Sequence, residues 1–397
     1  MKPFRTKLRT AAARLAAVLV SCLAGLLLLE AGIRLFLPAS QWKYHDSSMD
    51  WQPDARLGWV LRPSQDVTTV AEQGWSVRFR TNADGLTPVT ARREKPPGTV
   101  RIMLFGDSTV VGRSVPPEAT VHADLRRLLE RGGHRVDIVN AGVEGYSTDQ
   151  VLLQIERLIP LYHPDLVVYA FCDNDLGGNA GSEAYGVAKP RFRLEEDGRL
   201  RLVPIDRLDG EIPTFGGGPW KWVQFSAVYR VVRPRLMVLR ARFGDWEHRN
   251  LIGLPSEMYF DPRQLAAADW KLFSALLVRM KEVSAQSGAR FFFYSHPAIA
   301  EVWDPYIRDV EARAHLKPGQ YDRFALQKRL QAVASESGVL YCPLIESFVR
   351  QEKRGPFHLL PRDPHCNPVG YEVTAETLTA FLESSDLLNQ SQKPGSN

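Results

Sequence analysis

Arg101-Ile-Met-Leu-Phe-Gly-Asp-Ser-Thr-Val-Val-Gly112 is the stretch that decides the fold. Its apolar first half predicts a buried strand over Val100–Phe105, and Gly106, Asp107 and Ser108 follow where that strand ends. In an open α/β sheet, ligands bind at the carboxyl ends of the strands, because loops and helix N-termini with unpaired N–H groups meet there. Ser108 is therefore the candidate nucleophile.

Strand and helix patterns alternate along the rest of the chain. Further strands are predicted at 136–141, 165–171, 289–295 and 339–344, and helices at 123–131, 148–161, 262–287 and 321–337, with a last helix from Pro368. The strands are continuous apolar runs, which is typical of strands buried on both faces. Strands of this kind joined by helices specify a parallel sheet with right-handed crossovers. The predicted fold class is α/β.

Two regions fall outside this alternation. Residues 38–98 form a lead-in with Trp42, Trp51, Trp59 and Trp75 and a predicted hairpin at 67–81. Its aromatic residues could stack on sugars, but we expect them to cover the flank of the main domain. Residues 177–260 form an insertion with a predicted hairpin at 191–202, a glycine turn at 216–218 and a basic helix at 226–243. An insertion at this edge of the sheet is expected to cap the substrate pocket.

The first 37 residues predict a membrane anchor. Lys2, Arg5, Lys7, Arg9 and Arg14 precede the first acidic residue, and residues 15–29 contain no charged residue. Residues 15–37 are long enough to span a bilayer, and the basic segment 1–14 should stay in the cytoplasm. The chain after about residue 40 is then expected in the periplasm or extracellular space. Without these five cations the 50 basic residues fall to 45, equal to the 45 acidic ones, so no partner nucleic acid is expected.

Three alternatives for this segment stay open beside a retained signal anchor. A cleaved signal peptide would need better small residues than Ala31-Gly32 or Ala39-Ser40, and a lipoprotein site at Cys22 would need a polar stretch after it. A buried helix of a soluble domain conflicts with the one-sided basic flank.

Three cysteines lie outside the anchor: Cys172, Cys342 and Cys366. They include no Cys-x-x-Cys pair, so neither a disulfide framework nor a zinc site is indicated. A bridge between Cys172 and Cys366 stays open.

A serine hydroxyl needs a base, a group that orients the base, and donors for the oxyanion. The candidate base is His365, which lies between the last strand and the last helix, and Asp363 can orient it. His296 also follows a strand and competes for this role, but no carboxylate lies near it in sequence. The chemistry requires no metal or cofactor.

Candidate oxyanion donors follow the second and third strands. Gly145 ends Asn140-Ala-Gly-Val-Glu-Gly145 just before a helix, and Asn174 ends the turn after the third strand. Together with the backbone N–H of Ser108, these groups would meet at one edge of the sheet.

Gly106-Asp-Ser108, the turn at Gly145, Asn174-Asp175 and Asp363-Pro-His365 resemble the four motif blocks of the SGNH, or GDSL, hydrolase superfamily. The resemblance covers residues 99–385, followed by a polar tail at 386–397. It implies a flavodoxin-like three-layer α/β/α sandwich and serine esterase or lipase chemistry. It makes Ser108 nucleophile and donor, Gly145 and Asn174 donors, His365 base and Asp363 its orienting group, with Gly106 and Asp107 in support.

Two departures from the family pattern stand out. Many members place the aspartate three residues before the histidine, where this chain has Arg362, so Asp363 follows a shorter Asp-x-His spacing that also occurs in polysaccharide-modifying relatives. In the third block Asp173 stands where a glycine often precedes the asparagine.

We expect a membrane-anchored, extracytoplasmic esterase that acts on an O-acylated polysaccharide or another envelope ester. A lipase or lysophospholipase, an O-acyltransferase and a non-catalytic carbohydrate-binding scaffold are the alternatives, and the sequence leaves the oligomeric state open.

Overall fold

Strand β5 (Val100–Phe105) lies inside a five-stranded parallel sheet, and all six of its residues are buried. The other strands are β6 (Val136–Asn140), β7 (Leu166–Phe171), β12 (Arg290–Ser295) and β13 (Leu340–Cys342). The strand order across the sheet is β13-β12-β7-β5-β6. This is the flavodoxin-like order, in which the sheet changes direction of winding between β5 and β7. The predicted α/β class is confirmed.

The computed structural model describes residues 2–37, 50–70, 75–88, 90–208, 225–232, 269–314, 317, 321–359, 363 and 365–388. Several predictions concern residues outside these ranges: Trp42, the glycine turn at 216–218, residues 233–243 of the basic helix, residues 262–268 of the following helix and most of the polar tail.

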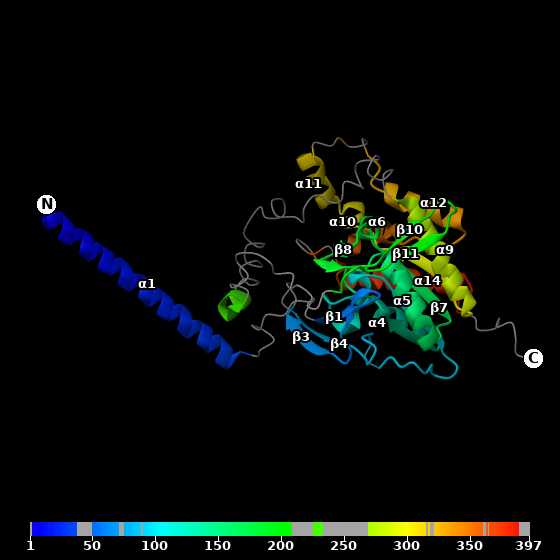
Figure 1. Ribbon diagram of the computed structural model, residues 1–397, viewed down its shortest axis with the longest axis horizontal. Coiled ribbons are helices and arrows are strands. Elements are labelled where there is room, and N and C mark those ends of the chain that lie inside the picture. Colours follow the sequence, from blue (N-terminus) through cyan, green and yellow to red (C-terminus); the bar gives the residue numbers. More distant parts are fainter. Residues whose placement is uncertain are drawn as a thin grey trace, which may run out of the picture.

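Helices cover both faces of the sheet and complete a three-layer sandwich (Figure 1). Helices α4 (Val121–Arg131) and α14 (Pro368–Ser384) pack together on one face, whereas α5 (Thr148–Tyr162), α9 (Trp270–Gln286) and α12 (Ala325–Ser337) cover the other. Because successive side chains of a strand point to opposite faces, Ile102 and Leu104 join one core while Met103 and Phe105 join the second.

The remaining elements are the N-terminal helix and a set of smaller strands and helices. They are α1 (Lys2–Phe36), β1 (Trp51–Asp54), β2 (Gly58–Leu61), β3 (Asp66–Val70), β4 (Ser76–Arg80), α3 (Ser108–Val111), η2 (Pro117–Ala119), α6 (Asn174–Ala180), β8 (Glu183–Ala184), β9 (Val187–Ala188), β10 (Arg191–Leu194), β11 (Leu200–Val203), α10 (Ile299–Val302), α11 (Asp304–Ala314), α13 (Ile345–Arg350) and η5 (Glu352–Arg354). The predicted hairpins at 67–81 and 191–202 correspond to β3–β4 and β10–β11.

Several predicted boundaries were wrong by a few residues. Helix α4 begins at Val121, two residues early, because Thr120 ends the preceding extended backbone and Val121 is buried. Helix α12 begins at Ala325 instead of 321, since Asp322 holds a turn by accepting a hydrogen bond from the Phe324 N–H. Strand β13 ends at Cys342 because Pro343 has no N–H for a ladder. The described part of the helix predicted at 262–287 is α9, which begins at Trp270 with Asp269 as its cap.

Two of the lead-in tryptophans belong to the core. Trp51 and Trp59 are fully buried, and their rings stack 5.3 Å apart. In the β3–β4 hairpin Val77 and Phe79 are buried while Arg78 and Arg80 are exposed, as the alternation predicts. These aromatic residues therefore cover the flank of the main domain.

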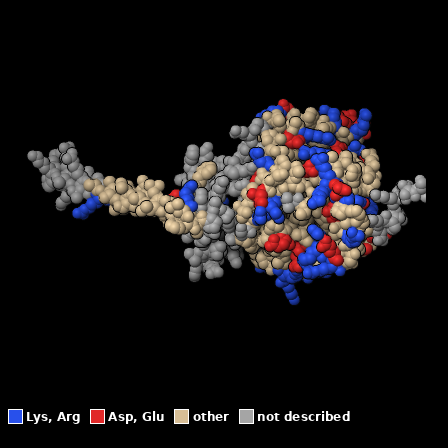
Figure 2. Space-filling model, turned by 90° about the horizontal axis from the view of Figure 1, so that it is seen from below, with Lys and Arg blue, Asp and Glu red and all other residues tan. Residues whose placement is uncertain are grey.

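Helix α1 extends away from the sheet in Figure 1. Its segment Ala13–Phe36 is apolar and long enough to cross a membrane, with a mean hydropathy of 2.2. This length and composition suit a membrane anchor or a signal sequence. On the face of the main domain shown in Figure 2, basic and acidic side chains are interspersed.

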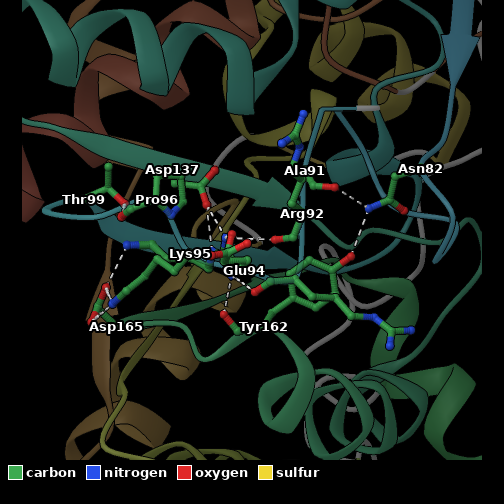
Figure 3. Close-up of polar contacts among 12 residues, drawn as sticks. Asn82, Ala91, Arg92, Glu94, Lys95, Pro96, Thr99, Asp137, Tyr162 and Asp165 are labelled. Atoms are coloured by element: carbon green, nitrogen blue, oxygen red, sulfur yellow. Dashed lines mark hydrogen bonds and ion pairs between the residues drawn. The ribbon is translucent and has the colours of Figure 1, made fainter.

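Arg101 is a fully buried cation on β5 that fastens the lead-in to the sheet. Figure 3 labels its partners Asp137, Arg92, Glu94 and Tyr162. Its Nε bonds to Asp137 at 2.7 Å, and its two amino groups donate to four backbone carbonyls. Those carbonyls belong to Arg92, Arg93, Glu94 and Tyr162. Five donors are thus satisfied at once, which is what allows a guanidinium to be buried.

Replacing Arg101 by methionine is expected to lower the free energy of unfolding by about 3–5 kcal/mol, because Asp137 and four carbonyls lose their donor. Urea unfolding of the two proteins measures this difference. The exposed Arg135, which donates one hydrogen bond to the Pro97 carbonyl at 3.3 Å, supplies the control: Arg135→Met should change stability by less than about 0.5 kcal/mol. Equal effects of the two substitutions would contradict the role of Arg101.

Candidate active site

Ser108, His365 and Asp363 form one line of hydrogen bonds at the carboxyl edge of the sheet. The Nε2 of His365 lies 2.7 Å from the Oγ of Ser108, and the Nδ1 of the same ring lies 2.5 Å from the Oδ1 of Asp363. The same carboxylate oxygen accepts the backbone N–H of His365 at 2.9 Å. The structure therefore brings Ser108 against an Asp363–His365 pair that lies more than 250 positions later in the sequence.

The turn that carries Ser108 is tight because of its neighbours. A Cβ at Gly106 would lie 2.6 Å from Cγ2 of Val110 and 2.9 Å from the carbonyl oxygen of Ala170, so glycine is required there. Asp107 caps α3 by accepting the Thr109 N–H at 2.9 Å. Ser108 is thus the first helical residue, and its side chain stays partly accessible.

The loop that carries His365 and Asp363 is held by backbone hydrogen bonds on both sides. The N–H of Leu359 donates to the His365 carbonyl and the N–H of Asn367 to the Phe357 carbonyl, each at 2.9 Å. The side chain of Asn367 accepts the Gly370 N–H and caps α14, which begins at Pro368 as predicted. These hydrogen bonds hold the loop that presents the imidazole to Ser108.

Charge and burial shift the pKa values of His365 and Asp363 in opposite directions. Burial alone disfavours the imidazolium, but the hydrogen bond and the charge of Asp363 outweigh burial and raise the pKa of His365 above 6.5. Burial likewise disfavours the carboxylate, but the hydrogen bonds and charge of His365 keep the pKa of Asp363 below 3.8. The aspartate is therefore ionised whenever the histidine gains or loses its proton.

The candidate donors lie in loops on either side of Ser108. Gly145 is buried and has a left-handed backbone with φ 75°, just before α5. Asn174 is the exposed first residue of α6, and its Nδ2 lies 3.4 Å from the carboxylate of Asp107. The loop of Asn174 is fixed by the buried Asp175, which accepts the Cys172 N–H at 2.9 Å and the Tyr169 hydroxyl at 2.6 Å. Burial raises the pKa of Asp175 well above 3.8.

Charged residues beside Gly112 and Gly145 were missed by sequence reasoning. Arg113 forms ion pairs with Asp50 and Glu144 and lies over the Phe79 ring at 3.6 Å from its centre. Glu144 also accepts the Trp51 indole N–H at 3.2 Å. These contacts tie the lead-in to the loop of Gly145. The sequence signal that could have identified Arg113 and Glu144 is their position next to Gly112 and Gly145.

The alternative base His296 is half-buried, and its Nδ1 lies 3.6 Å from the sulfur of Cys366 and 3.5 Å from the Thr374 hydroxyl. Burial lowers the pKa of His296 to about 3, so this ring stays neutral. Cys172 and Cys366 are both free thiols, and the bridge between them that the sequence left open is absent.

The sequence matches the model of the GDSL-like lipase/acylhydrolase family over residues 104–373. A search of curated proteins found no match. Among solved structures, the chain is similar to the acetyl xylan esterase AlAXEase, with 13% identity, a TM-score of 0.38 and coverage of 71% of this chain and 100% of the other. It is also similar to a lipase/acylhydrolase from Enterococcus faecalis, with 15% identity, a TM-score of 0.37 and coverage of 72% and 97%. The family match spans most of the main domain.

Proposed function

This chain belongs to the GDSL-like lipase/acylhydrolase family, and we propose that it is a membrane-anchored serine esterase that removes acyl groups from an O-acylated polysaccharide outside the cytoplasm. The observation that carries the proposal is the continuous line of hydrogen bonds from Ser108 through His365 to Asp363. The polysaccharide is proposed from the anchor and from the short Asp363-x-His365 spacing.

In the proposed mechanism the Ser108 oxygen attacks the ester carbonyl carbon while the Nε2 of His365 takes the hydroxyl proton. Asp363 holds the ring in the required tautomer and stabilises the imidazolium. The tetrahedral intermediate expels the alcohol, which leaves with the proton from His365, and an acyl ester remains on Ser108. Water then attacks this ester, His365 takes its proton, and the carboxylic acid is released with the serine restored.

The backbone N–H groups of Ser108 and Gly145 and the side chain of Asn174 are the proposed oxyanion donors. They follow β5, β6 and β7, which are neighbours in the sheet, and this common edge supports their proposed role. Backbone donors held by α3 and by the left-handed turn at Gly145 need no reorganisation during the reaction. Losing one such donor typically costs about 3–4 kcal/mol in the activation barrier.

Contacts at the end of α1 support a position of the insertion close to the membrane. Glu30 accepts the N–H groups of Ala227 and Val228 at 2.8 and 3.0 Å, and Arg34 donates to the Phe225 carbonyl at 2.9 Å. The short helix that contains residues 227–232 lies beside this end of α1 in Figure 1. Charged groups near a span are stable where polar partners satisfy them. We place these contacts at the outer surface of the bilayer, opposite the basic N-terminus.

Activity of the full-length chain in detergent on p-nitrophenyl acetate, with and without an oligosaccharide acceptor, tests the proposal. We expect acetate release and no transfer to the acceptor. Acyl transfer to the sugar would establish an acyltransferase instead, and faster cleavage of lysophospholipid would establish a lipase. No turnover of any ester by folded protein would support the non-catalytic scaffold and contradict the proposal.

The pH dependence of kcat/KM should show a single acidic limb with its midpoint above pH 6.5. His365 must be neutral to accept the serine proton, and its pKa is raised, so the inactive protonated form persists to higher pH than for a free imidazole. Below the midpoint the rate should fall about tenfold per pH unit. A rate profile with p-nitrophenyl acetate from about pH 5 to about pH 9 measures the limb. A midpoint below 6.5 would contradict the pairing of His365 with Asp363.

A further inference from the structure

The first hairpin of the insertion ends in an unusual turn. Strands β8 and β9 pair antiparallel, and Tyr185 and Gly186 connect them with φ 55° and 76°. Two positive φ values define the turn type that favours Asn-Gly, and a bulky residue rarely takes the first position. Tyrosine therefore occupies a place where the backbone would prefer asparagine or glycine.

The hairpin is held firmly against the main domain. Lys189, which follows β9, forms an ion pair with Asp149 of α5 at 2.6 Å, and both side chains are fully buried. The same ammonium group donates to the Gly178 carbonyl at 3.0 Å. Gly58 of β2 allows close contact with β9, since a Cβ there would lie 2.5 Å from the Ala188 carbonyl oxygen. These contacts hold β9, which directly follows the Tyr185-Gly186 turn, against α5, α6 and β2.

The ring of Tyr185 lies directly on Gly145. A Cβ at Gly145 would come within 2.2 Å of Cε2 of the tyrosine, so the ring occupies the space that any side chain would need. The edge of the ring meets Trp51, with ring centres 6.0 Å apart. Tyr185 nevertheless remains 52% exposed. One part of the ring therefore packs on the α-carbon side of Gly145, the candidate oxyanion donor, while the rest of the side chain remains open to solvent.

We propose that Tyr185 is a specificity-determining residue that restricts the acyl group to a short chain such as acetyl. The inference rests on the proposed function. The carbonyl oxygen bound at Gly145 belongs to the acyl group in both half-reactions, first in the substrate and then in the acyl-enzyme. A rigid ring against this glycine limits the space within a few bonds of the carbonyl carbon. A longer chain must displace the ring, which the braced hairpin resists.

The test compares kcat/KM of the full-length chain in detergent for p-nitrophenyl acetate and p-nitrophenyl octanoate. Tyr185→Asn removes the ring and creates the Asn-Gly pair that this turn favours, so the hairpin should keep its shape. Tyr185→Phe keeps the ring and serves as the matched control. We expect wild type and Tyr185→Phe to prefer acetate, and Tyr185→Asn to improve octanoate turnover about tenfold or more relative to acetate.

An unchanged ratio of acetate to octanoate rates in Tyr185→Asn would overturn the inference, as would a wild type that already hydrolyses octanoate as fast as acetate. The proposed function would survive both results, provided that Ser108→Ala abolishes the hydrolysis. Absence of ester hydrolysis by wild type would overturn the proposed function and this inference together. Labelling of Tyr185→Asn with a small fluorophosphonate shows that the variant is folded around an intact Ser108.

Discussion

Replacing Ser108 by alanine is expected to reduce kcat on p-nitrophenyl acetate by a factor on the order of 10⁶, to the residual rate that binding and oxyanion donors alone provide. The expected loss is this large because the Ser108 hydroxyl is the only group in the proposed mechanism that forms a covalent bond to the substrate. Its oxygen lies 2.7 Å from the Nε2 of His365, so removing the oxygen also leaves the base without a proton to take.

The fold should tolerate this substitution, since Ser108 begins a short helix that Asp107 caps without help from the serine side chain. Ser335→Ala, at an exposed position on α12, is the matched control and should leave kcat unchanged. If Ser108→Ala retained more than about a tenth of the wild-type rate, the nucleophile would have to be another group.

Asp363→Asn is expected to lower kcat by about 10⁴ while the fold and substrate binding persist. An asparagine can donate to the Nδ1 of His365 and so stabilise the tautomer whose Nε2 carries a proton. That tautomer points an N–H at Ser108 and cannot accept the serine proton. The carboxylate also stabilises the imidazolium, and an amide does not.

Steady-state kinetics of Asp363→Asn measures this effect on kcat separately from KM. Asp197→Asn, at the exposed tip of the β10–β11 hairpin, provides an aspartate substitution of the same chemistry away from the site. It should behave as wild type. A loss below about tenfold in Asp363→Asn would indicate that another group orients His365.

The central sheet was predictable because its buried strands are recognisable as apolar runs in the sequence. Strands β5 and β7 are buried along their whole length, so each appears in the sequence as an apolar run bounded by turn residues. Strands β1 and β2 were missed. They are four residues long, and Pro53 within β1 argues against a strand, since proline cannot donate to a ladder. Asp54, which accepts the N–H groups of Arg56 and Leu57, forms the turn between them.

The site was predictable only where short motifs mark it. Gly106-Asp-Ser108 follows a predicted strand directly, and Asp363-Pro-His365 lies between the last predicted strand and the last predicted helix. Parallel strands bring the segments that follow them to one edge of a sheet. The contact of Tyr185 with Gly145 has no such signal, because it joins an irregular insertion to a loop forty positions away. The same applies to the pair of Lys189 and Asp149, which depends on how the hairpin packs.

The activation of Ser108 by His365 is the central claim, and covalent labelling tests it most directly. Full-length protein in detergent is treated with a fluorophosphonate, and peptide mass spectrometry identifies the modified residue. The account predicts a single adduct on Ser108 in wild type, with labelling slowed by several orders of magnitude in His365→Ala. An adduct on another residue, or labelling of Ser108 at the same rate without His365, would contradict it.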